Sequence, residues 1–143
     1  MPLRSEITDP KEYNRLTVEE FRANKGKTLG DFEGRPILLL TTTGAKSGRE
    51  RVTPLIYADY GSRLIVTAAA GGQPNHPGWY HNIVANPRVR VEVGEDDFMV
   101  DAIVTSGEDR ARIFAERCAS SPAFNEYQAK TTREIPIIAL TRP

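Results

Sequence analysis

Cysteine, tryptophan and histidine are scarce in this chain of 143 residues, which contains one, one and two of them, respectively. The single cysteine, Cys118, excludes an intramolecular disulfide and fits a reducing compartment. Long apolar runs are missing too, and a membrane-spanning helix would need roughly 20 such residues. Residues 1–15 are polar and charged, unlike a secretory signal. We therefore expect a cytoplasmic protein.

The chain also lacks an excess of either charge. Nineteen lysines and arginines balance nineteen aspartates and glutamates, so the formal net charge is zero. Proteins that bind nucleic acids or anionic membranes generally carry a basic excess, and the balance argues against both partners. Any anion that the chain binds is expected to be small and held by a local group of cations. The length is typical of one domain.

One loop does concentrate positive charge. Lys46, Arg49 and Arg51 fall within six positions, and Gly44 and Gly48 lie among them. Glycine permits positive φ, so successive N–H groups can turn toward one anion. The spacing differs from a Walker A loop, which needs four residues between its first Gly and its Gly-Lys-Ser/Thr. The loop is therefore either an anion-binding nest or an ordinary polar hairpin turn, and the residue types alone do not separate the two.

Apolar and alternating segments predict six strands, at about 36–43, 52–60, 63–69, 89–93, 98–105 and 135–140. Their connections are mostly short, which favours antiparallel pairing, because parallel neighbours need a long crossover. The Gly-Ser turn at 61–62 predicts that the second strand pairs with the third. We expect a mainly β, α+β fold: a six-stranded antiparallel barrel, closed or partly closed, with short flanking helices.

The first helix is predicted from its capping signal. Thr17 and Glu20 have capping-box spacing, so the helix is expected to begin at Thr17. Residues 1–16 are then a flexible N-terminal segment, and residues 17–143 form a single domain.

Two further helices are expected. Pro77 favours a helix start, which predicts a helix over about 78–86. Another helix follows Ser106. Its apolar face is expected to hold Ala111, Phe114, Ala115 and Cys118.

The only tryptophan begins the second predicted helix. Trp79 can pack on a planar ligand whose edge Asn82 would hydrogen-bond, or it can plug one end of the barrel. His76 and His81 lie five positions apart with no cysteine or carboxylate nearby, so we expect no metal site. Tyr127 either donates a proton to a substrate or caps a loop.

Several separated motifs occur in a fixed order. They read Thr-Thr-Gly-x-Lys-Ser-Gly-x-x-Arg-Val-x-Pro-Leu, Gly-Gly, Pro-x-Trp-Tyr-x-Asn, Ala-Asn-Pro with Val-x-Val, and Arg-x-Ile-Pro-Ile. Together they resemble the deazaflavin-dependent nitroreductase family over about residues 17–143. The resemblance implies a flavin-reductase-like split β-barrel that binds coenzyme F420, an 8-hydroxy-5-deazaflavin with a phosphate and an oligoglutamate tail.

The resemblance also implies which residues bind the coenzyme. Lys46, Ser47 and Arg51 correspond to the family's phosphate contacts, and the other positions surround the ring. The full set is Ala45, Lys46, Ser47, Arg51, Val52, Thr53, Pro54, Leu55, Ile56, Thr67, Ala68, Ala69, Ala70, Gly78, Trp79, Tyr80, His81 and Asn82.

The substrate side departs from the family pattern. Ala69 stands where the nitroimidazole-reducing members carry a serine, and Phe124 stands where they carry a tyrosine. Tyr127 keeps a second tyrosine of that segment and is the candidate proton donor. We therefore expect a coenzyme site that is intact and a substrate side with fewer polar groups.

The expected function is F420H2-dependent hydride transfer to a quinone or an activated alkene, such as an enone or an unsaturated lactone, with nitro compounds disfavoured. Two alternatives stay open: a non-catalytic F420 carrier, and an FMN-binding oxidase on the same barrel. FMN is disfavoured because it lacks the oligoglutamate that three cations would hold. We expect a monomer or weak dimer. Membrane contact of the N-terminal segment is not favoured, because acidic residues dilute its basic character.

Overall fold

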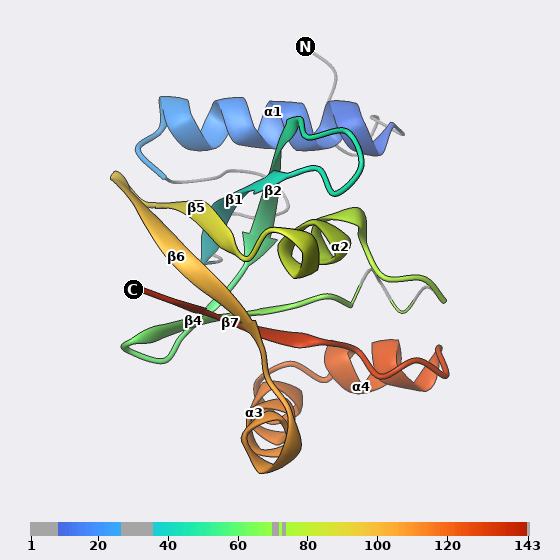
Figure 1. Ribbon diagram of the computed structural model, residues 1–143. Coiled ribbons are helices and arrows are strands. Elements are labelled where there is room, and N and C mark those ends of the chain that lie inside the picture. The colour runs from blue at the N-terminus through green and yellow to red at the C-terminus, as the bar shows by residue number, and fades with distance from the viewer. Residues whose placement is uncertain (1–8, 27–35, 70–71, 73, 143) are drawn as a thin grey trace.

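The computed structural model describes residues 9–26, 36–69, 72 and 74–142 (Figure 1). In chain order the elements are α1 (Pro10–Ala23), β1 (Ile37–Thr43), β2 (Glu50–Ile56), β3 (Ala58–Asp59), β4 (Arg63–Thr67), α2 (Gly78–Ala85), β5 (Arg88–Val93), β6 (Asp96–Val104), α3 (Gly107–Ser120), α4 (Ala123–Ala129) and β7 (Ile137–Thr141). Residues 1–8 of the N-terminal segment, and Ala70 of the expected coenzyme site, lie outside the described residues.

The seven strands of the described residues form one antiparallel sheet in the order β2-β1-β5-β6-β7-β4-β3. β2 and β3 lie at opposite edges of this sheet, yet only Tyr57 separates them in the chain. A flat sheet of this size would hold its edges roughly 29 Å apart, far more than one residue can span. The sheet must therefore curl until its edges approach, and it forms a half-barrel.

The strand count is the main correction to the expected fold. The segment 52–60 was predicted to be one strand paired with 63–69, which gave six strands. In the structure β2 pairs along its length with β1, and only Ala58–Asp59 pairs with β4. The two halves of the segment join opposite edges of the sheet, which divides it at Tyr57. The prediction of an antiparallel α+β fold is confirmed.

Apolar side chains fill the inside of the curl. They come from alternate residues of the strands, because successive side chains of a strand point to opposite faces. The buried strand members are Leu38, Leu40, Val66, Val89, Val91, Val100, Ile138 and Leu140, and Ala68 joins them just beyond β4. Trp79 and Ile83 of α2 complete this core, so α2 covers one end of the half-barrel.

The other face of β1 is buried beneath α1. Ile37 and Leu39 pack there against Phe21, with Val18 and Val52 beside them. β1 is therefore buried on both faces, which explains why its apolar residues run without alternation.

Helix α1 begins seven residues earlier than the capping-box spacing predicted. Asp9 caps it, since its side chain accepts a hydrogen bond from the Lys11 N–H at 3.0 Å, and a proline follows in the first turn. Thr17 lies inside the helix, fully buried, with its hydroxyl donating to the Tyr13 carbonyl at 3.0 Å. Residues 10–16 are thus helical rather than part of a flexible segment.

Helix α3 covers the outer face of β4 and β7, where Ile113 packs on Ile65, Ile137 and Ala139. The helix was predicted correctly, and its buried face only in part. Phe114 packs on this cluster as expected and Cys118 is partly buried, but Ala111 and Ala115 are exposed and the fully buried residue is Ile113. Small alanines fit either face of a helix, so the larger Ile113 sets the face that is buried.

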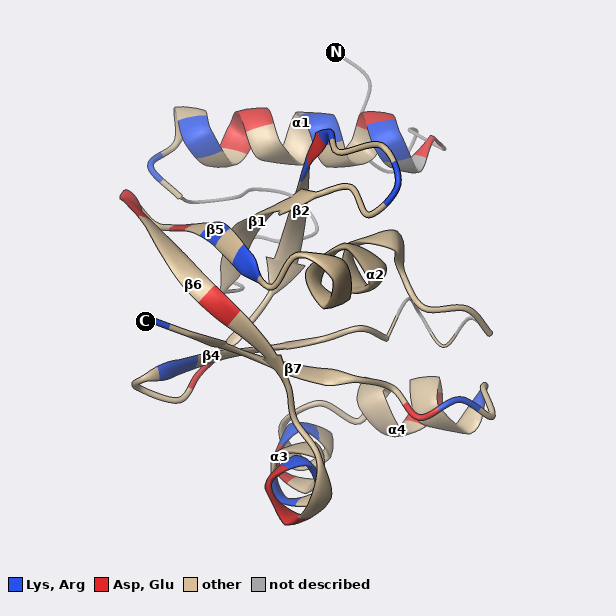
Figure 2. Ribbon diagram, in the orientation of Figure 1, with Lys and Arg blue, Asp and Glu red and all other residues tan. Residues whose placement is uncertain are grey.

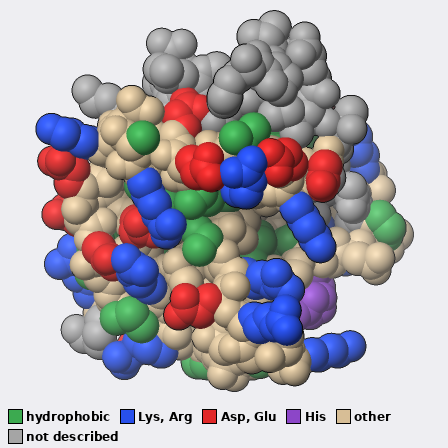
Figure 3. All heavy atoms as spheres, turned by 90° about the horizontal axis from the view of Figure 1, so that it is seen from above, with side chains coloured by type: hydrophobic (Ala, Val, Ile, Leu, Met, Phe, Trp, Pro, Cys, Tyr) green, Lys and Arg blue, Asp and Glu red, His purple; other side chains and the backbone are tan. Residues whose placement is uncertain are grey.

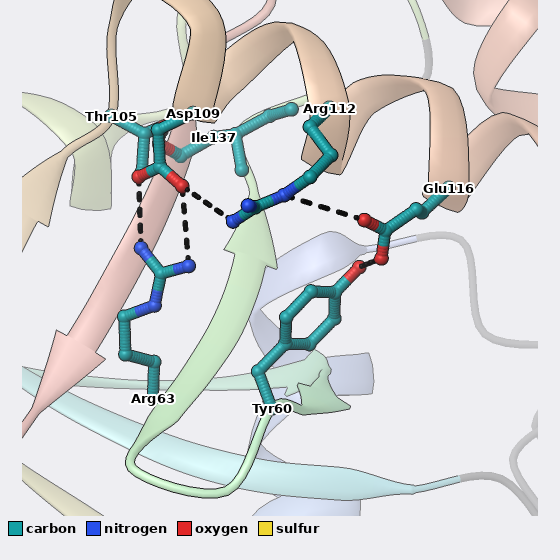
Figure 4. Close-up of polar contacts among 7 residues, drawn as sticks. All are labelled: Tyr60, Arg63, Thr105, Asp109, Arg112, Glu116 and Ile137. Atoms are coloured by element: carbon teal, nitrogen blue, oxygen red, sulfur yellow. Dashed lines mark hydrogen bonds and ion pairs between the residues drawn. The ribbon is translucent and has the colours of Figure 1, made fainter.

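A line of polar contacts holds α3 to the β3–β4 hairpin (Figure 4). Arg63 donates two hydrogen bonds to Asp109, at 2.8 and 3.2 Å, and Tyr60 donates one to Glu116 at 2.8 Å. Arg112 lies between the two carboxylates and contacts both. The bonds from Arg63 lower the pKa of Asp109. These groups are partly exposed to water, which weakens their attraction, so they fix orientation more than they stabilise the fold.

Charges of both signs are mixed over the described surface. Lysine and arginine alternate with aspartate and glutamate along α1 and α3 (Figure 2). The face seen from the α1 side also intersperses the two signs (Figure 3). None of the helices in the described ranges is long and apolar enough to span a bilayer.

The contact between α1 and the β5–β6 turn supplies a test of this fold. Gly26 and Gly94 both have positive φ, and a Cβ added at Gly26 would collide with the Gly94 backbone, whereas one added at Gly94 meets nothing within 4 Å. We predict that Gly26→Ala lowers the free energy of unfolding by about 3 kcal/mol, and Gly94→Ala by about 1 kcal/mol. Urea denaturation measures both, and equal losses would contradict the close approach.

Candidate coenzyme and substrate site

The basic loop forms the tight turn between β1 and β2. The Gly44 N–H donates to the Arg49 carbonyl at 2.7 Å, and the Gly48 N–H donates to the Gly44 carbonyl at 3.0 Å. Gly48 has a φ of +70°, which an L residue rarely adopts. The Ser47 hydroxyl accepts from the Arg49 N–H at 3.2 Å. The backbone therefore closes a hairpin turn between β1 and β2.

The three cations of this loop are exposed and make no ion pair within the described residues. Other arginines of the chain do pair; Arg22, for example, makes a two-bond contact with Glu92. Lys46 and Arg49 on the turn, with Arg51 at the start of β2, thus give three positive charges against the single negative charge of Glu50. Such a donor set fits a ligand with several negative charges, such as a phosphate with an oligoglutamate tail.

Asn82 anchors the basic loop to α2. Its Oδ1 accepts from the Ala45 N–H at 3.0 Å, and its Nδ2 donates to the Thr42 hydroxyl at 3.0 Å. Both ends of the amide are engaged, so Asn82 holds the loop against α2. The contact of Asn82 with a ring edge stays a prediction.

β4 has an open edge beyond its short pairing with β3. That pairing covers Leu64 and Ile65 only, so the following residues have no strand neighbour on that side among those described. A small hollow lies in this region. Its lining comes from four separate parts of the chain and consists of Ile56, Tyr57, Ala58, Ile65, Thr67, Arg117 and Phe124. Three residues of the expected site, Ile56, Thr67 and Phe124, are thereby brought together.

Arg133 is a residue whose role the sequence did not reveal. Its guanidinium donates to the Ala68 carbonyl at 3.0 Å and to the Ala69 carbonyl at 2.7 Å, and it lies 2.9 Å from His76 Nδ1. Arg133 stood in one of the motifs that carried the family resemblance, but nothing in the residue order indicated its partners. It joins the C-terminal motif to the strand end that should face the deazaflavin.

His76 packs against the rings of Tyr80 and His81, with centroids 4.5 and 5.9 Å away. Desolvation lowers the pKa of His76, and the charges of Arg133 and His81 lower it further. Because the Arg133 guanidinium can only donate, His76 Nδ1 accepts, and the imidazole is neutral with its proton on Nε2.

Helix α4 carries both substrate-side aromatic residues and was not predicted. Phe124 and Tyr127 meet edge to face, with centroids 6.4 Å apart. The Tyr127 hydroxyl has no hydrogen-bond partner among the described residues, and Phe124 lines the hollow whereas Tyr127 does not. The helix also lies close to Gly72, where a Cβ would come within 2.8 Å of the Tyr127 carbonyl.

Other expected coenzyme residues are placed less favourably for a ligand. Trp79 is only 8% exposed and belongs to the core, which is the plugging role considered above. Val52 packs beneath α1, whereas Leu55 packs on the inner core, so these two side chains face opposite sides of β2. The five consecutive residues from Val52 to Ile56 cannot all direct their side chains at one ligand.

A larger cleft, of about 300 Å³, lies elsewhere, between the end of α1 and the β5–β6 turn. Its lining includes the paired Arg22 and Glu92 together with Asp96 and Asp97. No residue of the expected site lines it, so size alone does not identify the site in this chain.

The curled antiparallel sheet, with cations on one hairpin and an open strand edge near α4, defines a half-barrel protein with a candidate site for an anionic ring cofactor. A profile of the F420H(2)-dependent quinone reductase family matches residues 13–142. The chain belongs to this family. The resemblance found in the sequence is therefore confirmed.

Individual relatives agree with the assignment. An F420H(2)-dependent quinone reductase of Mycobacterium tuberculosis (strain ATCC 25618 / H37Rv) is 43% identical, over 90% of this chain and 89% of the relative. A solved F420-H2 dependent reductase, FDR-A, is 40% identical, with a TM-score of 0.67, covering 74% of this chain and 94% of that one. Another solved relative, described as a domain-swapped dimer, is 36% identical with a TM-score of 0.69, covering 92% and 99%.

The lowered pKa of His76 gives a testable pH dependence. Folding favours the neutral imidazole, so His76 contributes to stability above about pH 6.5, and this contribution is lost as the pH falls through 6.5 toward the lowered pKa. We expect an NMR titration of the native protein to give a pKa below 6.5 for His76. Arg133→Gln should raise that pKa, because it removes a nearby positive charge. A His76→Asn spectrum assigns the resonance, and a pKa at or above the ordinary value would contradict the placement.

Proposed function

We propose that this chain is an F420H2-dependent quinone reductase with a flavin-reductase-like split β-barrel, and that residues 17–143 form one F420-binding domain. The observation that carries the proposal is a set of three exposed cations at the β1–β2 turn and the start of β2, none of which makes an ion pair with a described residue. A coenzyme with a phosphate and several glutamates would compensate all three. Membership of the family supports the same coenzyme.

The loop and α2 would bind the coenzyme tail. Lys46 and Arg51 would contact the phosphate or the glutamates, and Asn82 would keep the loop in place through its bonds to Ala45 and Thr42. The ring would then lie along the open edge of β4, near Thr67 and Ala69. The bound reduced coenzyme supplies the hydride.

The acceptor would lie at the mouth of the hollow between this edge and α4. The hollow itself has a volume of only about 10 Å³, so a quinone ring would rest against its apolar rim, formed by Ile56 and Phe124, rather than enter it. A quinone needs a hydride and a proton to become a quinol, so negative charge develops on its oxygen. The Ala69 N–H can stabilise that charge, and the Tyr127 hydroxyl can supply the proton. The Ala68 N–H cannot share this task, since it already donates to the Pro136 carbonyl at 2.9 Å.

An enone or unsaturated lactone is the second candidate acceptor. As in a quinone, its electrophilic carbon is conjugated with a carbonyl, and negative charge develops on the carbonyl oxygen when hydride is added. A bound coenzyme without turnover would indicate a carrier instead, and an FMN-binding oxidase is the other alternative. One relative is described as a domain-swapped dimer. For this chain we propose a monomer or weak dimer.

The decisive experiment is an assay of reduced F420 oxidation with a quinone, an unsaturated lactone and a bicyclic nitroimidazole, alongside fluorescence titration with F420 and FMN. We expect F420 to bind more tightly than FMN and the quinone to be reduced. Tight F420 binding with no turnover of any acceptor would favour the carrier. Protein purified with stoichiometric FMN would favour the oxidase.

The tail contacts can be tested separately. We predict that Lys46→Ala and Arg51→Ala each weaken F420 binding by about ten- to a hundredfold, since a charge-assisted contact contributes roughly 1.5–3 kcal/mol. Added salt should weaken binding by the native protein as well. Arg112→Ala, on the exposed face of α3, removes the same charge and should leave the affinity unchanged. Native affinity in both loop variants would exclude the loop from the site.

The acceptor preference can be tested at two positions. Ala69 has no hydroxyl and Phe124 no phenol, so a nitro group in the hollow lacks two hydrogen bonds, each worth roughly 1–3 kcal/mol in the transition state. We predict slow or absent nitroimidazole reduction beside measurable quinone reduction. Ala69→Ser combined with Phe124→Tyr should raise nitro reduction selectively. Equal native rates with the two acceptors would show that these positions do not set the preference.

A further inference from the structure

We propose that Arg133 is a positioning residue for this reaction: it fixes the Ala68–Ala69 peptide so that the Ala69 N–H points at the hollow where the acceptor would be reduced. This inference rests on the proposed function. Arg133 need not touch the coenzyme or the acceptor, because it would act through the backbone that it holds.

Arg133 holds this part of the backbone through two hydrogen bonds. The two terminal nitrogens of Arg133 donate to consecutive carbonyls, those of Ala68 and Ala69, at 3.0 and 2.7 Å. Consecutive carbonyls of an extended strand point to opposite sides, so a single guanidinium cannot reach both unless the chain leaves the extended form. β4 does end at Thr67, one residue earlier. Arg133 therefore holds the backbone in a shape that strand pairing alone would not give.

The orientation of the Ala69 N–H follows from these hydrogen bonds. The carbonyl of Ala68 and the N–H of Ala69 belong to one planar trans peptide, and they point in opposite directions. The Ala68 carbonyl faces Arg133, and the Ala68 N–H faces Pro136, just before β7. The Ala69 N–H therefore faces away from β7. On that side lies the open edge of β4, beside the hollow lined by Ile56 and Thr67.

The Ala69 N–H is also available to donate a hydrogen bond to a ligand. No hydrogen-bond partner for it lies among the described residues, although Ala69 is only 7% exposed. A buried donor without a partner is costly, so such groups are rare and tend to occur where a ligand binds. The positive charge behind the peptide polarises it, which makes the N–H a stronger donor to a developing oxyanion.

Arg133 is itself held from two sides. Its carbonyl accepts from Gln128 Nε2 at 2.7 Å, and Gln128 Oε1 accepts from the Ile135 N–H at 3.1 Å. Gln128 lies on α4, beside Tyr127. The guanidinium also reaches His76 Nδ1 at 2.9 Å. One arginine thus links α4, which carries the expected proton donor, to the strand end that carries the expected oxyanion donor.

The test compares Arg133→Gln and Arg133→Lys with a matched control, Arg110→Gln. Arg110 donates to the Ile135 carbonyl at 2.7 Å and lies over the Phe114 ring, so it also holds backbone near β7, but on the α3 side. We expect Arg133→Gln to lower kcat for quinone reduction by about ten- to a hundredfold with KM for F420H2 nearly unchanged, because the lost interaction is made in the transition state. Arg133→Lys should keep only part of kcat, since a single ammonium group cannot donate to both carbonyls in the geometry of a guanidinium. Arg110→Gln should keep kcat.

A second measurement does not depend on activity. The ¹H–¹⁵N signal of Ala69 in the ligand-free protein should shift and broaden in Arg133→Gln but not in Arg110→Gln. An unchanged Ala69 signal, or a kcat loss equally large in Arg110→Gln, would overturn the positioning role. A native protein that reduces no acceptor would overturn the proposed function instead, and the Ala69 signal would still decide whether Arg133 fixes this peptide.

Discussion

The single residue between β2 and β3 constrains the whole molecule. Tyr57 joins strands that lie at opposite edges of the sheet, so the sheet has to curl, and its inner face has to be filled. The curl gives β1 two buried faces, creates an end that α2 can cover with Trp79, and leaves room outside for α1 and α3. It also leaves β4 with a neighbour along only part of one edge. The candidate site occupies that unpaired length.

Two sets of polar contacts then fix the positions of the basic turn and of the backbone after β4, which the curl alone does not determine. Asn82 ties the basic turn to α2, and Arg133 ties the end of β4 to the chain before β7. Both use hydrogen bonds between segments that are far apart in sequence. Neither set adds much apolar burial, so their contribution is to geometry. A rigid scaffold of strands with a few fixed polar contacts is well suited to orienting two reactants.

Much of this arrangement could be predicted from the sequence, and the failures have physical causes. Hairpin turns and alternation located the strands, because these signals are local. The division at Tyr57 could not be found this way, since it depends on which distant strand each half joins. The buried face of α3 was predicted only in part: Phe114 packs on the sheet, but the expected alanines are exposed and Ile113 is buried in their place. At the candidate site, motif order indicated which segments to consider, but the partners of Asn82 and Arg133 are long-range contacts that no local pattern records.

The expected site draws its parts from elements of unequal rigidity. The basic turn and β4 belong to the paired sheet, whereas Phe124 and Tyr127 stand on α4, a helix of seven residues with no fully buried side chain. Substitutions of Phe124 or Tyr127 therefore remove no fully buried side chain, whereas Gln128 of the same helix holds Arg133 and Ile135. Under the proposed roles, changes at Phe124 and Tyr127 would alter the compound that is reduced and leave the basic turn that holds the coenzyme tail untouched.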